Sequence, residues 1–99
     1  MPSLSIITPT YNRGYLLPVL FHSLEKQTCF DFEWILVDDG SDDDTEAVAK
    51  TFFNDLFPFV YIKKENGGKH TALNASHPYV KGKYVLILDS DDYLTEDAV

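Results

Sequence analysis

Four short apolar runs, separated by stretches with helical periodicity, constrain this sequence more than any other feature. We predict that the runs are strands, and they cover Leu4–Thr8, Glu33–Val37, Phe59–Ile62 and Tyr84–Leu88. The second and fourth runs are almost continuously apolar, which is typical of parallel strands covered on both faces. Because strands that alternate with helices join by right-handed crossovers, the sequence predicts an α/β domain with a parallel sheet.

Three helices are predicted between these strands. The first covers Tyr15–Gln27, where apolar side chains recur every three or four positions. The second begins at a capping Thr45 and ends at Phe53, and the third runs from Gly68 to about Ser76. The inward-facing side chains of the first two helices are predicted to be Leu16, Leu17, Leu20, Phe21, Leu24, Ala47, Val48 and Phe52.

Charge and composition limit the kinds of molecule that this chain is expected to bind. The chain has 99 residues, enough for one small domain, and 44% of them are hydrophobic, which is typical of a globular protein. Its net charge is -8, with acidic clusters in segments 38–46 and 89–97. Such a surface repels nucleic acid, so no nucleic-acid partner is expected. An anionic ligand would need a cation to bridge it to these carboxylates.

Features that would place the chain outside the cytoplasm are missing from the sequence. The single cysteine, Cys29, excludes an internal disulfide framework and fits a reducing compartment. No apolar run approaches the ~20 residues of a membrane span, and no signal peptide precedes the first strand. We therefore expect no transmembrane segment and a cytoplasmic location, with peripheral action at a membrane left open.

Each predicted strand is followed by a polar turn. The four turns are Thr8–Arg13, Asp38–Ser41, Glu65–His70 and Asp89–Asp92. In an open parallel sheet, ligands bind where the carboxyl ends of the strands meet the crossover loops. Four unusual turns at the same edge therefore predict one binding site.

These segments resemble the successive motifs of family 2 glycosyltransferases. The resemblance lies in Ser5–Arg13, Ile35–Ser41 and Leu88–Asp92, and the Gly-rich segment between the last two is similar in Asn66, Gly67, Gly68, Ala72 and Asn74. It covers essentially all 99 residues in the expected order, which makes the set far more specific than any single motif.

The resemblance implies a GT-A fold, a Rossmann-like three-layer α/β/α arrangement. Its sheet is expected to be mostly parallel with strand order 3-2-1-4. Residues 1–99 would form the N-terminal part, which binds the nucleotide-sugar, and the acceptor-binding half would follow. The segment Leu94–Val99 is similar to the first turn of a helix, so we expect this chain to be part of a larger fold.

Roles for the first two turns follow from the same resemblance. It implies that Pro9, Thr10 and Tyr11 line the pocket for base and ribose, with the Tyr11 ring available for stacking. Asp39 would accept a hydrogen bond from a uracil-type N–H, which only an acceptor side chain can recognise. From the residues alone two alternatives stay open: Tyr11 packed over the first helix, and turn chemistry for both aspartates, which we favour for Asp38.

The acidic turn Asp89–Asp92 would hold the metal and the diphosphate. We favour Asp91 as a ligand of Mn²⁺ or Mg²⁺, with Asp89 as a further ligand or ribose neighbour. Ser90 would lie near ribose and phosphate, and Asp92 is either a second candidate ligand or a helix-start acid. From the residues alone, an acidic helix entry before Tyr93 is the alternative for the whole turn. The metal would stabilise charge on the departing diphosphate.

Two further segments have weaker assignments. Lys69 follows two glycines at a predicted helix start, where backbone N–H groups and an ammonium can bind phosphate; a solvated lysine is the alternative. Ser41 and Asp42–Asp44 are expected to start the next helix rather than to contact ligand. No Walker or dinucleotide-binding Gly motif is present.

The predicted function is transfer of a sugar from a nucleotide-diphosphate donor, UDP-linked by preference, to a hydroxyl of a carbohydrate or lipid-linked acceptor. The family resemblance implies a carboxylate base from the second half, beyond Val99, so this chain alone is expected to bind weakly without turnover. A bare edge on the fourth strand predicts a homodimer.

Two alternatives come from other classes. One is a non-catalytic nucleotide-binding or assembly module. The other is a receiver-like phosphoacceptor domain. Asp38 and Asp39 resemble the paired aspartates that end one strand of such a domain, but here they follow the second strand, and the first strand ends in Thr-Pro-Thr-Tyr.

Overall fold

The computed structural model describes residues 3–12, 14–27, 30–53 and 56–88, without the side chains of residues 69, 70, 72 and 73. Its sheet has four parallel strands in the order β3-β2-β1-β4. They are β1 (Leu4–Thr10), β2 (Phe32–Asp38), β3 (Phe59–Lys63) and β4 (Tyr84–Ile87). The predicted strands, their direction and their order are confirmed.

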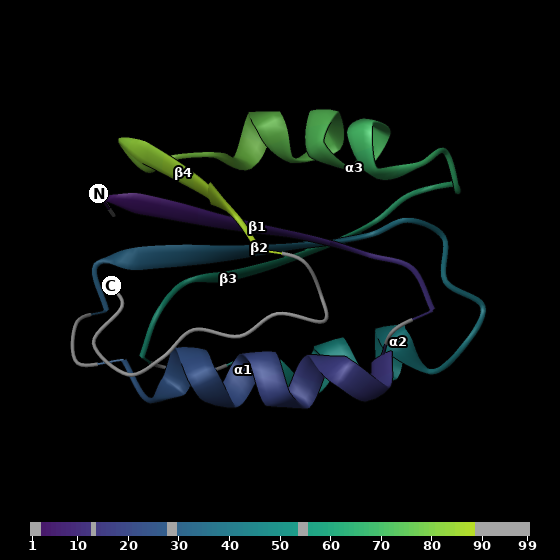
Figure 1. Ribbon diagram of the computed structural model, residues 1–99, viewed down its shortest axis with the longest axis horizontal. Coiled ribbons are helices and arrows are strands. Elements are labelled where there is room, and N and C mark those ends of the chain that lie inside the picture. The colour runs from purple at the N-terminus through teal and green to yellow at the C-terminus, as the bar shows by residue number, and fades with distance from the viewer. Residues whose placement is uncertain (1–2, 13, 28–29, 54–55, 89–99) are drawn as a thin grey trace.

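Helices cover both faces of this sheet, and Figure 1 shows α1 and α2 on one side and α3 on the other. Each is continued or preceded by a short 3-10 turn. In chain order the elements are η1 (Gly14–Leu16), α1 (Leu17–Glu25), α2 (Thr45–Ala49), η2 (Lys50–Phe52), α3 (Lys69–Ser76) and η3 (His77–Tyr79). The three-layer α/β/α prediction is confirmed.

The start of α2 differs from the prediction. Thr45 is the first helical residue rather than the cap. The backbone N–H of Thr45 donates a hydrogen bond to the Asp43 carboxylate at 2.9 Å. Thr45, Ala49 and Phe52 are buried, whereas Ala47 is exposed. The predicted inward position of Ala47 is therefore wrong. The buried residues Thr45, Ala49 and Phe52 are spaced by four and three positions and share one face of the helix, and Ala47 lies on the opposite face.

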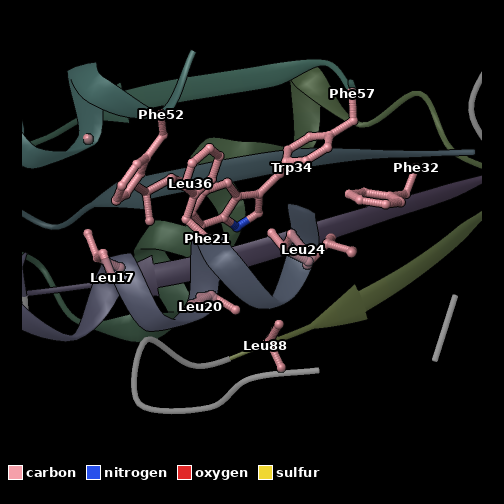
Figure 2. Close-up of a cluster of buried hydrophobic side chains, with 12 residues drawn as sticks. Leu17, Leu20, Phe21, Leu24, Phe32, Trp34, Leu36, Phe52, Phe57 and Leu88 are labelled. Atoms are coloured by element: carbon pink, nitrogen blue, oxygen red, sulfur yellow. The ribbon is translucent and has the colours of Figure 1, made fainter. Parts of the chain in front are cut away.

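Most of the core lies between the sheet and the helices α1 and α2, and Figure 2 shows its aromatic and leucine side chains together. The rings of Phe21 and Phe52 stack with centroids 4.5 Å apart. Trp34 is fully buried beside them, and its indole N–H donates to the Thr8 hydroxyl at 2.9 Å. The opposite face has a smaller cluster around Ile7, Ile35 and Val37.

The two strands predicted to be covered on both faces differ in burial. Every residue of β2 is buried, as predicted. On β4 the prediction is wrong: Tyr84 is 65% exposed, and Val85 and Ile87 are exposed as well. This strand lies at the edge of the sheet and pairs only with β1 among the described strands, and the homodimer through it stays a prediction. Within the described ranges, no helix is long and apolar enough to cross a membrane.

Candidate functional site

The loops that follow β1, β2 and β3 meet at one end of the sheet, on the right in Figure 1. Backbone hydrogen bonds join them: the N–H of Asp39 donates to the carbonyl of Thr10 at 2.8 Å, and the N–H of Lys64 donates to the carbonyl of Asp38 at 2.9 Å. This is the edge at which open α/β sheets bind ligands, so the predicted convergence of three of the four turns is confirmed.

Asn12 joins the first loop to the second. Its backbone N–H donates to the Ser41 hydroxyl at 2.8 Å, and its side-chain oxygen accepts from the N–H of Asp42 at 2.8 Å. Its φ of 51° lies in the left-handed region, where asparagine is enriched. These two bonds join the first loop to the second.

Asp38 is a framework residue. It is fully buried, and its two oxygens accept from the Ser41 N–H at 2.8 Å and from the Tyr61 hydroxyl at 2.6 Å. Burial, together with the hydrogen bond to this carboxylate, raises the pKa of Tyr61. The favoured interpretation of Asp38 as a turn residue is therefore confirmed.

Asp39 has a different environment, although it is the next residue. Its Oδ1 accepts from the Lys64 ammonium at 2.7 Å and from the Gly67 N–H at 3.0 Å, and its Oδ2 accepts from the Gly68 N–H at 2.9 Å. Burial raises the pKa of Asp39, but the hydrogen bonds from Lys64, Gly68 and Gly67 outweigh it and hold this pKa below its ordinary value. Asp39 is thus an ionised acceptor at the convergence of the loops.

Two glycines allow the Gly-rich segment to approach Asp39. Gly40 has φ +78°, and a Cβ there would lie 2.8 Å from the backbone nitrogen of Asn66. Gly68 has φ 96°, which presents its N–H to the carboxylate at the start of α3. A larger residue at either position would disturb the backbone that holds Asp39.

Of the predicted base-pocket residues, Thr10 is joined to Asp39 by the backbone hydrogen bond above, and Pro9 and Tyr11 flank Thr10 in the chain. Pro9 is buried, and Thr10 is 3% exposed with a hydroxyl oxygen that finds no hydrogen-bond partner among the described residues. Tyr11 is 44% exposed. A buried hydroxyl without a described partner is unusual in a folded protein.

The predicted metal and phosphate residues are mostly outside the described part of the chain. Asp89, Ser90, Asp91 and Asp92 all lie there, and of Lys69 only the backbone is described, as the first residue of α3. Among the described side chains, no three of histidine, cysteine, aspartate and glutamate cluster as metal ligands would. The metal assignment stays a prediction.

Two site residues had no predicted role: Asn12 and Lys64. For Lys64 a signal was available, because β2 and β3 are neighbours and Asp38 pairs with Lys63. The residue after each partner, Asp39 and Lys64, is then also adjacent, with opposite charge. The role of Asn12 depends on side-chain contacts between loops, which its sequence neighbourhood does not indicate.

Comparison with known proteins decides the family. The model of "Glycosyl transferase family 2" matches residues 5–99. The chain belongs to glycosyl transferase family 2. The receiver-like alternative is therefore wrong.

Relatives share this region as part of longer proteins. The chain is 38% identical over 96 residues to a PGL/p-HBAD biosynthesis glycosyltransferase of Mycobacterium bovis, covering 96% of this chain and 38% of the relative. It is 42% identical over 101 residues to a chondroitin synthase of Pasteurella multocida, covering 100% of this chain and 10% of the relative. The chain thus spans well under half of these relatives.

Solved structures show the same fold. The structure of S. aureus TarS 1-349 in complex with UDP matches with a TM-score of 0.88 and 32% identity, over 98% of this chain and 29% of that one. The mannosyltransferase PcManGT from Pyrobaculum calidifontis, in complex with GDP-Man and Mn²⁺, matches with a TM-score of 0.86 and 28% identity, over 93% and 28%. The fold is the N-terminal part of a GT-A domain.

Proposed function

We propose that this chain binds the nucleotide-diphosphate sugar, a UDP-sugar by preference, from which a glycosyltransferase transfers the sugar to an acceptor hydroxyl. The observation that carries this proposal is Asp39: an ionised carboxylate held by Lys64, Gly67 and Gly68 where three loops of a family 2 domain converge. An acceptor-only side chain in this place suits a base that offers an N–H.

The first loop would complete the base and ribose pocket. The exposed ring of Tyr11 offers a stacking surface, and the Thr10 hydroxyl offers a hydrogen bond that the described residues leave unmade. Pro9 would shape the pocket wall, because its ring fixes the backbone as β1 ends. Bonds from Asn12 to the second loop support this arrangement.

Asp91 and Asp89 are proposed as ligands of Mn²⁺ or Mg²⁺, with Ser90 beside the ribose and diphosphate and Lys69 near the phosphates. The solved relatives support a nucleotide donor and a metal by what they contain, which is UDP in one and GDP-Man with Mn²⁺ in the other. A bound divalent cation would supply Lewis-acid stabilisation of the leaving diphosphate. For Lys69, the start of α3 supports the proposal because helix N-termini favour anions.

A carbohydrate or lipid-linked acceptor is proposed as the partner of the complete enzyme. The catalytic base is not assigned to any residue of this chain. The competing proposal, a nucleotide-binding module without catalysis, shares the donor site and differs only in turnover. UDP release from a UDP-sugar by the intact protein in the presence of acceptor would separate the two.

The binding site itself is tested by calorimetric titration of UDP with and without Mn²⁺. In Asp39→Ala we expect UDP affinity to fall by about 100-fold, because a hydrogen bond to a charged acceptor is lost along with the support of the Gly-rich turn. In Asp91→Ala we expect UDP binding that no longer depends on Mn²⁺.

Asp42→Ala is the matched control, since it removes an exposed aspartate from the same loop. It should bind UDP as the unaltered protein does. UDP binding that is indifferent to both Asp39→Ala and Asp91→Ala would contradict the site assignment.

A further inference from the structure

Lys64 is the described cation that reaches into the candidate site. Its ammonium lies 2.7 Å from Asp39 Oδ1 and donates to the Thr71 hydroxyl at 3.0 Å and to the carbonyl of Glu65. Its side chain is 20% exposed, so the ion pair is largely shielded from water. Lys63, one residue earlier, instead pairs with Glu46 on the surface, 3.1 Å away.

The contacts leave Asp39 with an asymmetric set of acceptor positions. Each carboxylate oxygen has about two lone-pair positions. On Oδ1 both are used, by Lys64 at 2.7 Å and Gly67 at 3.0 Å. On Oδ2 one is used, by Gly68 at 2.9 Å, so among the described contacts a single position stays open.

We propose that Lys64 is a specificity-determining residue, which occupies Asp39 Oδ1 so that the carboxylate accepts from a base with one ring N–H, such as uracil, and not from the paired N–H groups of guanine. This inference rests on the proposed function and adds to it how the base is selected. Uracil offers one imide N–H between two carbonyls, which fits one open oxygen. Guanine offers two adjacent donors that need both oxygens, so one would be left unpaired and desolvated.

Lys64 also keeps the acceptor ionised. Burial raises the pKa of Asp39, and the hydrogen bond from Lys64 is the largest of the effects that lower it. Without Lys64 the pKa of Asp39 should be higher. As the pH is lowered, binding of the base should then begin to weaken at a higher pH than in the unaltered protein. Lys64 thus acts on the nucleotide through Asp39, as a positioning residue.

The test compares UDP and GDP affinities by calorimetry in the intact protein, in Lys64→Met and in the control Lys63→Met. The unaltered protein and the control should bind UDP at least about tenfold more tightly than GDP. In Lys64→Met that ratio should fall to about one, and the loss of UDP binding toward acid should begin at higher pH. Lys64→Arg, which keeps a cationic donor, should retain the UDP preference.

The outcomes separate the two proposals. Binding of neither nucleotide by the unaltered protein would contradict the proposed function. UDP binding with an unchanged preference in Lys64→Met, or no preference in the unaltered protein, would overturn the role of Lys64 and leave the donor site standing. If Lys64→Met does not fold by circular dichroism, Lys64→Gln takes its place, with the same shift of the acid limit expected.

Discussion

Two buried carboxyl groups lie at opposite ends of the sheet, one in a structural network and the other in the proposed donor site. Glu33, at the amino end, has Oε2 bonded to the Ser5 hydroxyl at 2.6 Å and to the Lys81 N–H at 2.7 Å, and the Gly82 N–H donates to Ser5 at 2.7 Å. Asp39, at the carboxyl end, is held by a lysine and two glycine N–H groups.

The two groups differ in what holds them. Glu33 is bonded to β1 and to the segment that leads into β4, so its contacts tie strands together. Asp39 is bonded to Lys64 and to one Gly-rich turn, and the Thr10 hydroxyl, which has no partner among the described residues, lies at the end of neighbouring β1. Burial of a carboxyl group is therefore no sign of function by itself. The loops around it and the hydrogen-bond capacity left over are what indicate a ligand.

The largest expected change in stability is at the amino end. Glu33→Ala leaves the Ser5 hydroxyl and the Lys81 N–H without their acceptor, so we expect the free energy of unfolding to fall by about 3 kcal/mol. UDP affinity at a temperature where the variant is folded should not change. Urea unfolding and calorimetry measure the two quantities, and a loss of UDP binding in folded Glu33→Ala would break the contrast between the ends.

Alanine substitutions of two glycines, one at each end of the sheet, should change the stability less than Glu33→Ala does. A Cβ on Gly82 would lie 2.5 Å from the backbone nitrogen of Ser5, and one on Gly40 would lie 2.8 Å from that of Asn66. Either alanine variant should lower the free energy of unfolding by about 2 kcal/mol. Only Gly40→Ala should also weaken UDP binding, because it displaces the turn that holds Asp39.

Equal UDP affinities in the folded Gly40→Ala and Gly82→Ala variants would show that the position of the Gly-rich turn has no influence on the ligand. Thermal unfolding followed by circular dichroism identifies the temperature range in which both variants can be compared.

The smallest expected effect is the pH dependence of stability that Asp39 contributes. Its folded pKa is lowered, so the folded carboxyl binds fewer protons than the unfolded one. The stabilisation is then present above pH about 4 and is lost as the pH falls through the folded pKa. In Asp39→Asn it is missing, so the difference in free energy of unfolding from the unaltered protein should shrink as the pH is lowered below about 4. A difference that is constant over this range would contradict the lowered pKa.

Much of the fold could be predicted from the sequence, because its signals are local. The apolar runs identified all four strands, the repeat of leucines identified α1, and the paired glycines identified the start of α3. The strand order came from the ordered motifs of the family resemblance. The edge position of β4 was expected, but the exposure of its side chains was missed, since an apolar run alone does not show whether both faces of a strand are covered.

The site could be located but not detailed. Its position followed from the polar turns at the strand ends, yet its bonds join residues far apart in the chain, such as Asp39 with Gly68 and Asn12 with Ser41. The different environments of the neighbours Asp38 and Asp39 also depend on contacts with residues far apart in the chain. Alternate side chains of a strand face opposite sides, and which one meets the Gly-rich turn depends on how the loops pack.

The role of Asp39 in binding the base is best tested by a crystal structure of the intact protein with UDP and Mn²⁺. We predict that the uracil N–H donates to Asp39 Oδ2 at hydrogen-bond distance, while Lys64 and the Gly67 N–H remain on Oδ1 and Glu33 stays remote from the ligand. A uracil ring that binds away from Asp39, or that displaces the Gly-rich turn from it, would contradict the proposed role of Asp39.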